Sequence, residues 1–259
     1  MLKEERIKAM NTYITKNKTA TMQELADNFH ISANTLRRDL NELLKKGDKF
    51  KKIYGGVILN ENYTNSLIDY RQREHTTSID KIAIGKKAAT LIENGDLIFF
   101  DSGTTTDAIA PFLPKNISFT LITNSLQLIE AASPLENIKI IVVGSQFNRK
   151  TRSFTGIDSK LFESYNLNKS FMSATGISLN NGVTNSEFNE FRIKSSIIKK
   201  SIANSNQQNF LLIDHTKFDK TALMTYAQIK NFYGIITNNT VPQKYSNYFK
   251  QNDIRVFIA

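Results

Sequence analysis

Two stretches of this chain combine residue types at spacings that suit binding chemistry. The first is the run Asp-Ser-Gly-Thr-Thr-Thr at residues 101–106, in which a glycine lies among hydroxyl side chains. Hydroxyl groups and the free N–H groups of a helix start bind phosphate well, and Gly103 permits a close backbone approach to a ligand. An ordinary strand-to-helix turn with a threonine cap would look the same, so the run alone leaves both interpretations open.

The second stretch is the arginine pair Arg37-Arg38. Leucines recur beside it at i, i+4, i+7 and i+8, which predicts one apolar stripe on a helix that starts after Ser32 and stops near Gly47. The opposite face carries polar and basic side chains, with Arg37 at its edge: Asn34, Arg38, Asn41 and Lys45. Arginine and asparagine side chains can pair with guanine and adenine edges in the major groove of DNA.

The elements around this pair predict a helix-turn-helix. A second apolar stripe over Met22–Phe29, capped by Thr21, precedes it, and only the turn His30–Ser32 separates the two helices. A third stripe, starting at Ile7, supplies a supporting helix, and residues 49–59, broken at Gly55, predict a β-hairpin wing whose lysines suit phosphate contacts. The plain alternative is a three-helix bundle with a solvated basic face.

Charge agrees with a polyanion partner. The chain has a formal net charge of +10 at pH 7, and residues 1–60 carry 12 Lys and Arg against 7 Asp and Glu. Half of the excess therefore lies in less than a quarter of the length. A concentrated positive field favours a polyanion and makes binding sensitive to salt, although it does not identify the polyanion.

The remainder of the chain predicts an α/β domain with a mainly parallel sheet. Short apolar runs alternate with helical patterns, as expected of βαβ units. The predicted strands are 97–100, 119–123, 138–143, 170–174, 210–214, 234–237 and 254–258. The predicted helices are 81–93, 105–112, 125–132, 187–203 and 243–251. The predicted domains are a DNA-binding domain at 1–58, a polar linker at 59–68 and an effector domain at 69–259.

Ligands bind beyond the carboxyl ends of strands in such sheets, which adds further candidates to the run at 101–106. Asp214 ends a predicted strand, and Lys217 could reach a phosphate there or pair with Asp219 on the surface. Arg152 belongs to a glycine-flanked basic loop that would hold an anion or be solvated. Asn124 follows another predicted strand. Several anion-friendly loops at one edge favour a single site.

Other classes are disfavoured by composition. The chain has no cysteine, which excludes disulfides and thiolate chemistry, and its three histidines lack metal-ligand spacing, so we expect no metal and no cofactor. No signal peptide and no membrane-length apolar run is visible. We therefore expect a cytoplasmic protein with no membrane partner.

Together, these pieces resemble the DeoR family of transcriptional regulators over nearly the full length. The matching motifs, in order, are Thr35–Leu40, Tyr54-Gly55-Gly56, residues 101–106, Thr123-Asn124-Ser125, Gly144–Gly156, Ala174–Ile177 and Asp214–Phe218. The resemblance implies a repressor of a sugar-utilisation operon, modulated by a sugar phosphate. It also implies an effector domain related in fold to ribose-5-phosphate isomerase, and a homo-oligomer, either dimer or tetramer, that binds double-stranded operator DNA.

Carried over by position, the resemblance gives two sets of site residues. The DNA-contacting set is Ser32, Asn34, Thr35, Arg37, Arg38, Asn41, Lys45, Lys51, Lys52 and Tyr54. The effector-contacting set is Asp101, Ser102, Gly103, Thr104, Thr105, Thr106, Asn124, Arg152, Gly176, Asp214 and Lys217.

The chain departs from the family pattern at three places. The wing is one residue longer than usual and has lysines where an arginine is usual, which puts its register and base contacts in question. Ser145 replaces a usual glycine and Asn168 a frequent aspartate. We expect these two residues at the edge of the pocket, where they would shift the sugar preference.

Two other classes of function are consistent with parts of the sequence. A sugar-phosphate isomerase would need a base and a second carboxylate, yet residues 173–177 have no carboxylate, and Glu187 and Glu190 are expected to lack an acidic partner. We therefore expect binding without turnover and no catalytic residues. An activator, or a DNA-binding protein without a ligand response, would begin with the same groove contacts as a repressor.

Overall fold

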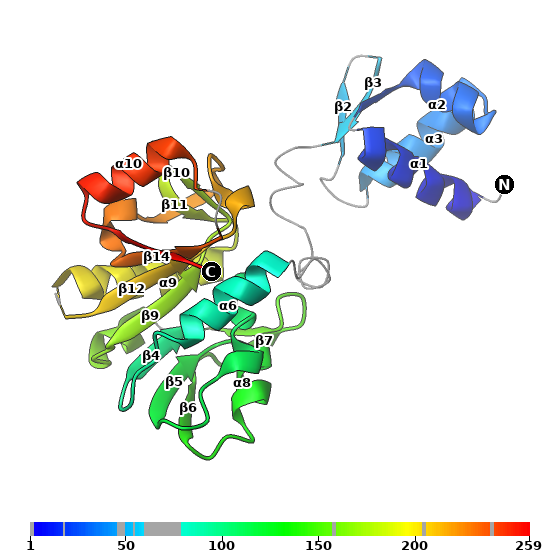
Figure 1. Cartoon of the computed structure of the whole chain (residues 1–259). Coiled ribbons are helices and arrows are strands. Elements are labelled where there is room, and N and C mark those ends of the chain that lie inside the picture. Colours follow the sequence, from blue (N-terminus) through cyan, green and yellow to red (C-terminus); the bar gives the residue numbers. More distant parts are fainter. Residues whose placement is uncertain are drawn as a thin grey trace. The chain divides into compact units, whose positions relative to one another are not determined.

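The protein is described by a computed structural model covering residues 3–17, 19–45, 50–53, 55–59, 79–156, 159–203, 206–238 and 241–259. The chain divides into two compact units, Met1–Ile68 and Asp69–Ala259 (Figure 1). The predicted linker at 59–68 lies almost wholly outside the described residues, so its bounds stay a prediction.

The first unit consists of three helices and a small antiparallel sheet with strand order β1-β3-β2. Its elements are α1 (Lys3–Asn17), β1 (Thr19–Thr21), α2 (Met22–Phe29), α3 (Ala33–Lys45), β2 (Phe50–Ile53) and β3 (Gly56–Leu59). The predicted stripes of the three helices, including Leu36 and Leu40, meet in one buried core. The predicted helix-turn-helix and wing are therefore both present.

Local capping explains where α2 begins and ends. The Thr21 side chain accepts from the backbone N–H of Glu24 while the Glu24 carboxylate accepts from the Thr21 N–H, which is a capping box. His30 ends the helix in the left-handed region at φ 50° and turns the chain into α3. His30 is thus a residue of the turn, as predicted.

The second unit is built on a seven-stranded sheet in which each neighbouring pair is parallel, with order β15-β14-β12-β9-β4-β5-β6. The strands are β4 (Leu97–Phe100), β5 (Phe119–Thr123), β6 (Ile138–Val142), β9 (Lys169–Ser173), β12 (Gln208–Leu212), β14 (Gly234–Thr237) and β15 (Arg255–Ile258). All seven predicted strands are present, and the α/β class is confirmed.

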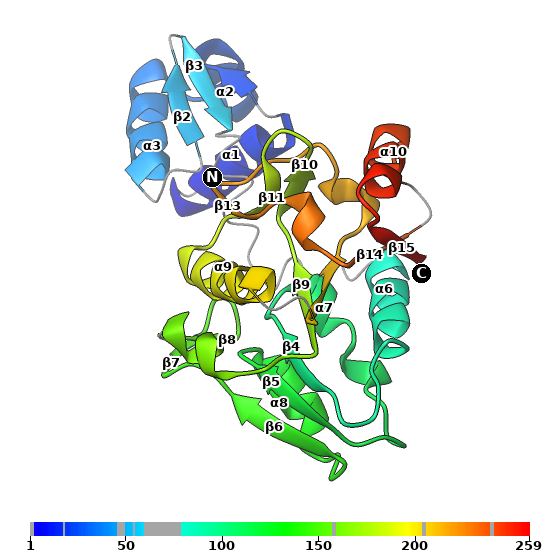
Figure 2. The ribbon, with the colours of Figure 1, turned by 90° about the vertical axis from the view of Figure 1, so that its left-hand side faces the viewer.

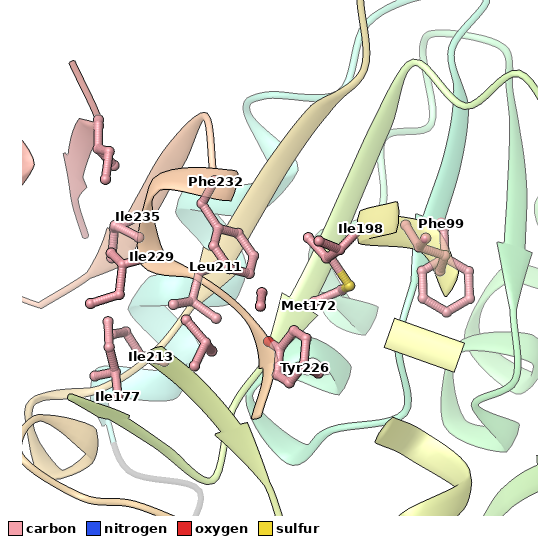
Figure 3. Packing of buried hydrophobic residues seen from close by; sticks show 14 of the residues in the cluster. Phe99, Met172, Ile177, Ile198, Leu211, Ile213, Tyr226, Ile229, Phe232 and Ile235 are labelled. Atoms are coloured by element: carbon pink, nitrogen blue, oxygen red, sulfur yellow. The ribbon is translucent and has the colours of Figure 1, made fainter. Parts of the chain in front are cut away.

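Helices cover both faces of this sheet (Figure 2). On one face, α6 (Ile79–Ala89) and α8 (Leu126–Ala132) bury residues such as Ile84 and Leu128 against the strands. On the other face, α9 (Phe188–Ala203) and α10 (Gln243–Gln251) pack on the core shown in Figure 3, which includes Met172 and Leu211. Alternate strand residues therefore serve two cores, as both-sided burial of a parallel sheet requires.

The predicted helix 105–112 is wrong as one continuous element. The chain forms α7 (Thr104–Asp107) and then a separate 3₁₀ turn, η1 (Ala110–Phe112). Pro111 lies in the first turn of η1, and its ring removes the N–H donor that a continuing α-helix would need.

Short strands were not predicted. They are β7 (Gln146–Asn148), β8 (Ser153–Thr155), β10 (Gly176–Ser178), β11 (Gly182–Asn185) and β13 (Met224–Ala227), alongside 3₁₀ turns η2 (Ser159–Ser164), η3 (His215–Lys217) and η4 (Ile229–Asn231). The first two form a hairpin, and the last three strands form a second sheet with order β10-β11-β13. These segments lack the apolar run that marks equally short strands such as β4, so their sequence does not identify them as strands.

Within the part of the chain that the structure describes, no helix is long and apolar enough to cross a membrane. The described residues also hold no cluster of three or more His, Asp or Glu side chains that could bind a metal ion.

Candidate effector site and DNA-binding helix

Polar residues follow the carboxyl ends of five neighbouring strands in the second unit. In sheet order they are Asn238 after β14, Asp214 after β12, Ser173 at the end of β9, Asp101 after β4 and Asn124 after β5. Because parallel strands end at the same edge, one stretch of that edge gathers most of the predicted effector residues.

Asp101 is a buried carboxylate that organises its own loop. Its Oδ1 accepts from the Gly103 N–H at 3.1 Å and from the Thr106 hydroxyl, and its Oδ2 accepts from the Ser173 N–H at 2.8 Å. The Ser173 hydroxyl and the Lys194 ammonium also donate to Oδ2, at 3.0 and 2.8 Å. Five donors use the acceptor capacity of both oxygens, so Asp101 ties the β4 loop to β9 and α9.

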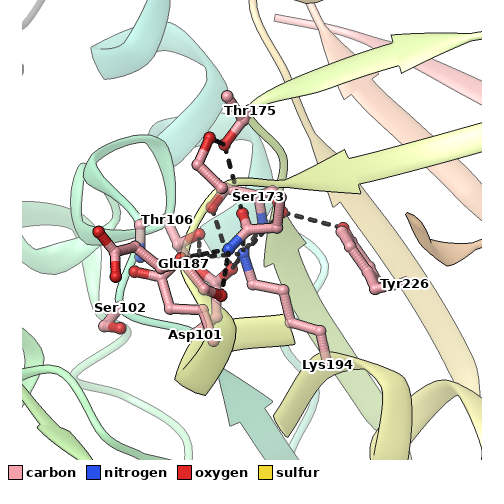
Figure 4. Close-up of polar contacts among 12 residues, drawn as sticks. Asp101, Ser102, Thr106, Ser173, Thr175, Glu187, Lys194 and Tyr226 are labelled. Atoms are coloured by element: carbon pink, nitrogen blue, oxygen red, sulfur yellow. Dashed lines mark hydrogen bonds and ion pairs between the residues drawn. The ribbon is translucent and has the colours of Figure 1, made fainter. Parts of the chain in front are cut away.

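Lys194 is the central residue that the sequence-based prediction missed (Figure 4). It projects from α9, is 1% exposed, and its ammonium contacts the carboxylates of Asp101 at 2.8 Å and Glu190 at 3.7 Å. It also donates to the Ser173 carbonyl at 2.9 Å and to the side chain of Asn185 at 3.3 Å. One signal was visible in the sequence, because residue 194 falls on the same helical stripe as the buried Ile197 and Ile198.

The structure contradicts the expectation that Glu190 lacks an acidic partner, because folding brings a second carboxylate close to it. Asp101 shares the Lys194 ammonium with Glu190, although the two carboxylates are far apart in sequence. Glu190 accepts from Asn185 Nδ2 at 2.8 Å as well. The cluster therefore contains two carboxylates and one ammonium, all bonded within the protein.

The pKa values in this cluster follow from burial and charge. Burial by itself would raise the pKa of Asp101, but the Lys194 ammonium and the donors from Thr106 and Ser173 outweigh it and lower that pKa. Burial raises the pKa of Tyr226 well above its usual value, and the negative charge of Asp101 adds to the effect. Tyr226 remains a phenol that donates to the Ser173 carbonyl at 2.9 Å.

Gly103 and Gly176 are required by packing. A Cβ on Gly103 would lie 1.9 Å from the Ser173 hydroxyl, and a Cβ on Gly176 would lie 2.4 Å from the carbonyl oxygen of Lys220. Both distances are far inside van der Waals contact. The contact with β9 is thus one structural reason for a glycine at position 103, and its expected contact with a ligand stays a prediction.

Thr104 is the accessible hydroxyl of the loop. Ser102, Thr105 and Thr106 are buried, whereas Thr104 is half-buried and accepts from the Lys81 ammonium at 3.2 Å. Lys81 lies on α6, is 6% exposed, and was not predicted as a site residue. Its position three residues before the buried Ile84 placed it on the inner face of that helix.

The first turn of α6, which carries Lys81, also contacts the loop after β12. Asp80, beside Lys81, contacts the Nδ1 atom of His215 at 3.2 Å, and His215 lies in η3 together with Lys217. Thr104 and η3 follow strands that are not neighbours in the sheet, since β9 lies between β4 and β12. The first turn of α6 therefore brings the loops of Thr104 and Lys217 to one corner of the unit.

Asp214 is buried and is bonded to its own turn, because its Oδ1 accepts from the N–H and the hydroxyl of Thr216. For Asp219, the surface partner expected for Lys217, the structure gives an ion pair with another lysine. Asp219 contacts the Lys244 ammonium at 2.6 Å and also accepts from the Tyr245 hydroxyl at 2.9 Å.

Asn124 and Arg152 differ in their relation to the β4 loop. Asn124 is buried and its Nδ2 donates to the Ser102 hydroxyl at 3.2 Å, while its Oδ1 has no hydrogen-bond partner among the described residues. Arg152 lies in the turn between β7 and β8 at φ 49°, and its guanidinium contacts Glu130 of α8 at 3.2 Å. The structure thus brings Asn124 to the loop and turns the Arg152 side chain toward α8.

Asn168 and Ser145, the two departures from the family pattern that were expected at the edge of the pocket, lie at opposite edges of the sheet. Asn168 precedes β9 and accepts from the N–H of Leu97 at the start of β4, so it lies at the amino edge of the sheet. Its expected place at the pocket edge is wrong. Ser145 follows β6 at the carboxyl edge, where its hydroxyl donates to the carbonyl of Gly156 at 3.1 Å.

The polar face predicted for α3 is exposed in the first unit. Asn34, Arg37, Arg38 and Asn41 are all exposed, and the Ser32 hydroxyl caps the helix by accepting from the N–H of Thr35 at 3.3 Å. Arg37 and Lys52 line one small crevice between α3 and the wing. Tyr54 lies outside the described residues, as do the side chains of Lys45 and Lys51, so their roles stay predictions.

One structural residue of the recognition helix was not predicted. Asp39 is 2% exposed and its carboxylate accepts from the Arg6 guanidinium of α1 at 2.7 Å. The side chain hydrogen bond to Asp39 raises the pKa of Arg6 above its usual value. This pair fixes α3 against α1 and accounts for the buried aspartate next to the exposed arginine pair.

Comparison with known proteins gives a consistent result. Residues 6–63 match the family model "DeoR-like helix-turn-helix domain", and residues 76–239 match "DeoR C terminal sensor domain". The chain is 40% identical over 255 residues to the HTH-type transcriptional regulator IolR of Bacillus subtilis, covering 98% of each chain.

Two further relatives carry different regulatory names. The L-fucose operon activator of Haemophilus influenzae is 31% identical, with 93% of this chain and 94% of that protein covered. The lactose phosphotransferase system repressor of Staphylococcus aureus is 28% identical, with 91% of this chain and 92% of that protein covered.

Among solved structures, ribose 5-phosphate isomerase A from Methanocaldococcus jannaschii is similar at 15% identity and a TM-score of 0.35, over 53% of each chain. The isomerase-like fold of the second unit therefore stays a prediction. The two matched domains and the full-length relatives decide the family. This chain belongs to the DeoR family of helix-turn-helix transcriptional regulators, with a DNA-binding domain followed by a sensor domain.

Proposed function

We propose that this regulator represses a sugar-utilisation operon and is controlled by a phosphorylated sugar bound at the carboxyl edge of its seven-stranded sheet. The observation that carries the proposal is the buried Lys81 ammonium 3.2 Å from the half-buried Thr104 hydroxyl. An ammonium beside hydroxyl groups suits a phosphate group. The lactose and fucose names of two relatives support a carbohydrate as the remainder of the ligand.

We assign the predicted effector residues to two roles on the basis of their contacts. Thr104, Lys81 and Lys217 are proposed to bind the phosphate. Asp101 and Thr106 are bonded to each other and buried, so we assign them to holding the loop. A carboxylate that accepts five hydrogen bonds has no lone pair to offer, and it would repel a phosphate.

Asn124 is proposed to recognise a hydroxyl group of the sugar. Its Oδ1 is buried without a partner among the described residues, whereas buried polar atoms are nearly always hydrogen-bonded. A ligand hydroxyl next to the Ser102–Asn124 pair would satisfy this acceptor. Ser102, Gly103, Thr105, Gly176 and Asp214 then serve as the wall of the site, and Arg152 stays a candidate at its rim.

The sensor site is proposed to bind its ligand without turnover. Asp101 is the one carboxylate of the Lys194 cluster that reaches the β4 loop, and its lowered pKa makes it a poor base. Interconversion of aldose and ketose phosphates by the purified chain would contradict this assignment.

The test uses the full-length chain and a panel of glucose 6-phosphate, fructose 6-phosphate, fructose 1,6-bisphosphate and inorganic phosphate. A bound compound should raise the melting temperature by mass action and change the affinity for a DNA duplex selected by the chain from a random library. Lys81→Gln and Thr104→Val should abolish both responses and leave DNA binding without the compound unchanged. No response of the wild-type chain to any compound would refute the sensor assignment and favour a regulator without a ligand.

Repression and activation are separated by a reporter gene placed behind the selected DNA sequence. A repressor lowers reporter output and the active sugar phosphate restores it. The name of the fucose relative favours activation as the second candidate, and output that rises with the regulator would establish it.

A further inference from the structure

The first turn of α6 contacts both loops of the proposed sensor site through consecutive residues. Lys81 donates to the Thr104 hydroxyl of the β4 loop at 3.2 Å, and Asp80 contacts His215 of η3 at 3.2 Å. α6 is also the first described element of the sensor unit, after the segment that connects it to the DNA-binding unit. The turn is therefore well placed to report occupancy of the site.

A tight backbone contact makes α6 sensitive to movement of the β4 loop. A Cβ on Gly85 would lie 2.4 Å from the carbonyl oxygen of Ala108, which follows α7. The helix and the end of α7 are thus in direct contact with no side chain between them. Packed elements of this kind move together or not at all, because close-packed interiors transmit displacement.

His215 has two competing partners for one nitrogen. Its Nδ1 lies 3.2 Å from the Asp80 carboxylate and 3.0 Å from Nδ2 of Asn238. Nδ1 must carry a proton to bond Asp80, and it must lack one to accept from Asn238. Both His215 and Asp80 are partly exposed, so the contact between α6 and η3 is weak and can be displaced.

We propose that an anion bound at Thr104 and Lys81 breaks the contact between Asp80 and His215, and that this release of the first turn of α6 transmits sensor occupancy to DNA binding. The inference rests on the proposed function, whose site it uses. An anion bound at Lys81 would add a negative charge at the helix turn that also carries the Asp80 carboxylate, and like charges repel. The same anion would attract the ammonium group of Lys217 in η3.

Two variants separate the charge from the contact. Asp80→Asn removes the like charge and the ion pair, so it should bind the active compound of the panel more tightly. Its DNA affinity without the compound should shift by about fivefold toward the value of the compound-bound wild type. His215→Gln removes the ion pair and keeps the Asp80 charge. It should show the same shift in DNA affinity without the tighter binding of the compound.

The control is Glu93→Gln, which also replaces a partly paired carboxylate by an amide in this unit. Glu93 lies beyond the other end of α6, where it contacts Lys169. This variant should keep the wild-type DNA affinity and the wild-type response.

Each outcome decides between the two proposals. If the wild type responds to a panel compound but Asp80→Asn and His215→Gln keep wild-type DNA affinities with and without it, the coupling through α6 is refuted and the sensor site stands. If no compound affects the wild type, the sensor site fails and the coupling fails with it. Equal shifts in Glu93→Gln would show a general charge effect and would also refute the coupling.

Discussion

At the scale of one residue, the contacts of Asp101 within the protein differ from the effector contact that its sequence motif predicts. Its carboxylate accepts from two backbone N–H groups, two hydroxyls and the Lys194 ammonium, all within the β4 loop, β9 and α9. A buried ion pair is costly to desolvate, and removing one partner leaves the other charge unpaired in a low dielectric. The Lys194–Asp101 pair therefore holds the loop in one geometry.

Asp101→Asn should destabilise the sensor unit by about 3–5 kcal/mol, because it leaves the Lys194 ammonium without its nearest carboxylate. Urea unfolding followed by circular dichroism measures the change, because the chain has no tryptophan for fluorescence. The matched control is Asp219→Asn, an exposed partner of Lys244, which should leave the midpoint nearly unchanged. Similar midpoints for the two variants would contradict the anchoring role.

The pH dependence of stability follows from the lowered pKa of Asp101. In the unfolded chain the pKa of an aspartate is about 3.9. Because the folded pKa is lower, the ionised Asp101 contributes its full stability above the unfolded value, and this contribution is lost as the pH falls through the folded pKa. The stability gap between wild type and Asp101→Asn should therefore be constant near neutral pH and shrink on acidification below about pH 4. A gap that is constant over the whole acidic range would contradict the assignment.

At the scale of the element, the two arginines of the recognition helix α3 have different surroundings. Leu36 and Leu40 are buried, Arg37 and Arg38 are both exposed, and Arg37 shares a crevice with Lys52 of the wing. A cation between helix and wing is well placed for the phosphate backbone. Arg38 is left as the stronger candidate for a base edge.

Arg38→Ala should cost about 1–3 kcal/mol on the selected duplex and little on random DNA, because a base contact carries sequence information. Arg37→Ala should weaken both kinds of DNA alike and lower the salt dependence by about one phosphate. Fluorescence anisotropy at several salt concentrations separates the two. Equal losses for Arg38→Ala on both DNAs would mark it as a backbone contact instead.

At the scale of the whole molecule, a helix-turn-helix regulator commonly binds two half-sites as a dimer. We therefore expect the chain to form a dimer or tetramer and to select an inverted repeat from a random library. The half-sites should lie about 10 base pairs apart or a multiple of that spacing, one turn of the double helix. Sedimentation of the protein–DNA complex gives the stoichiometry. A single unrepeated site bound by one chain would contradict this expectation.

The sequence determined the elements and the family. Leucines at i, i+4, i+7 and i+8, the Thr21 cap and the turn at Gly55 decide local structure, and these signals act between residues that are close in the chain. For the same reason the seven strands of the parallel sheet were recognised, whereas three-residue strands such as β10 were not. The predicted helix over 105–112 failed because Pro111 breaks it.

The tertiary structure decided which polar residues meet. Lys194 and Asp101 are 93 residues apart in the numbering, and only the packing of α9 on the sheet brings them to 2.8 Å. Tertiary packing also surrounds the Asp101 carboxylate with donors from β9 and α9, sets Asn168 at the opposite edge of the sheet and, through α6 on the other face, places Lys81 beside Thr104. A contact between distant residues depends on the register and layering of the whole sheet, and no local pattern in the sequence contains that information.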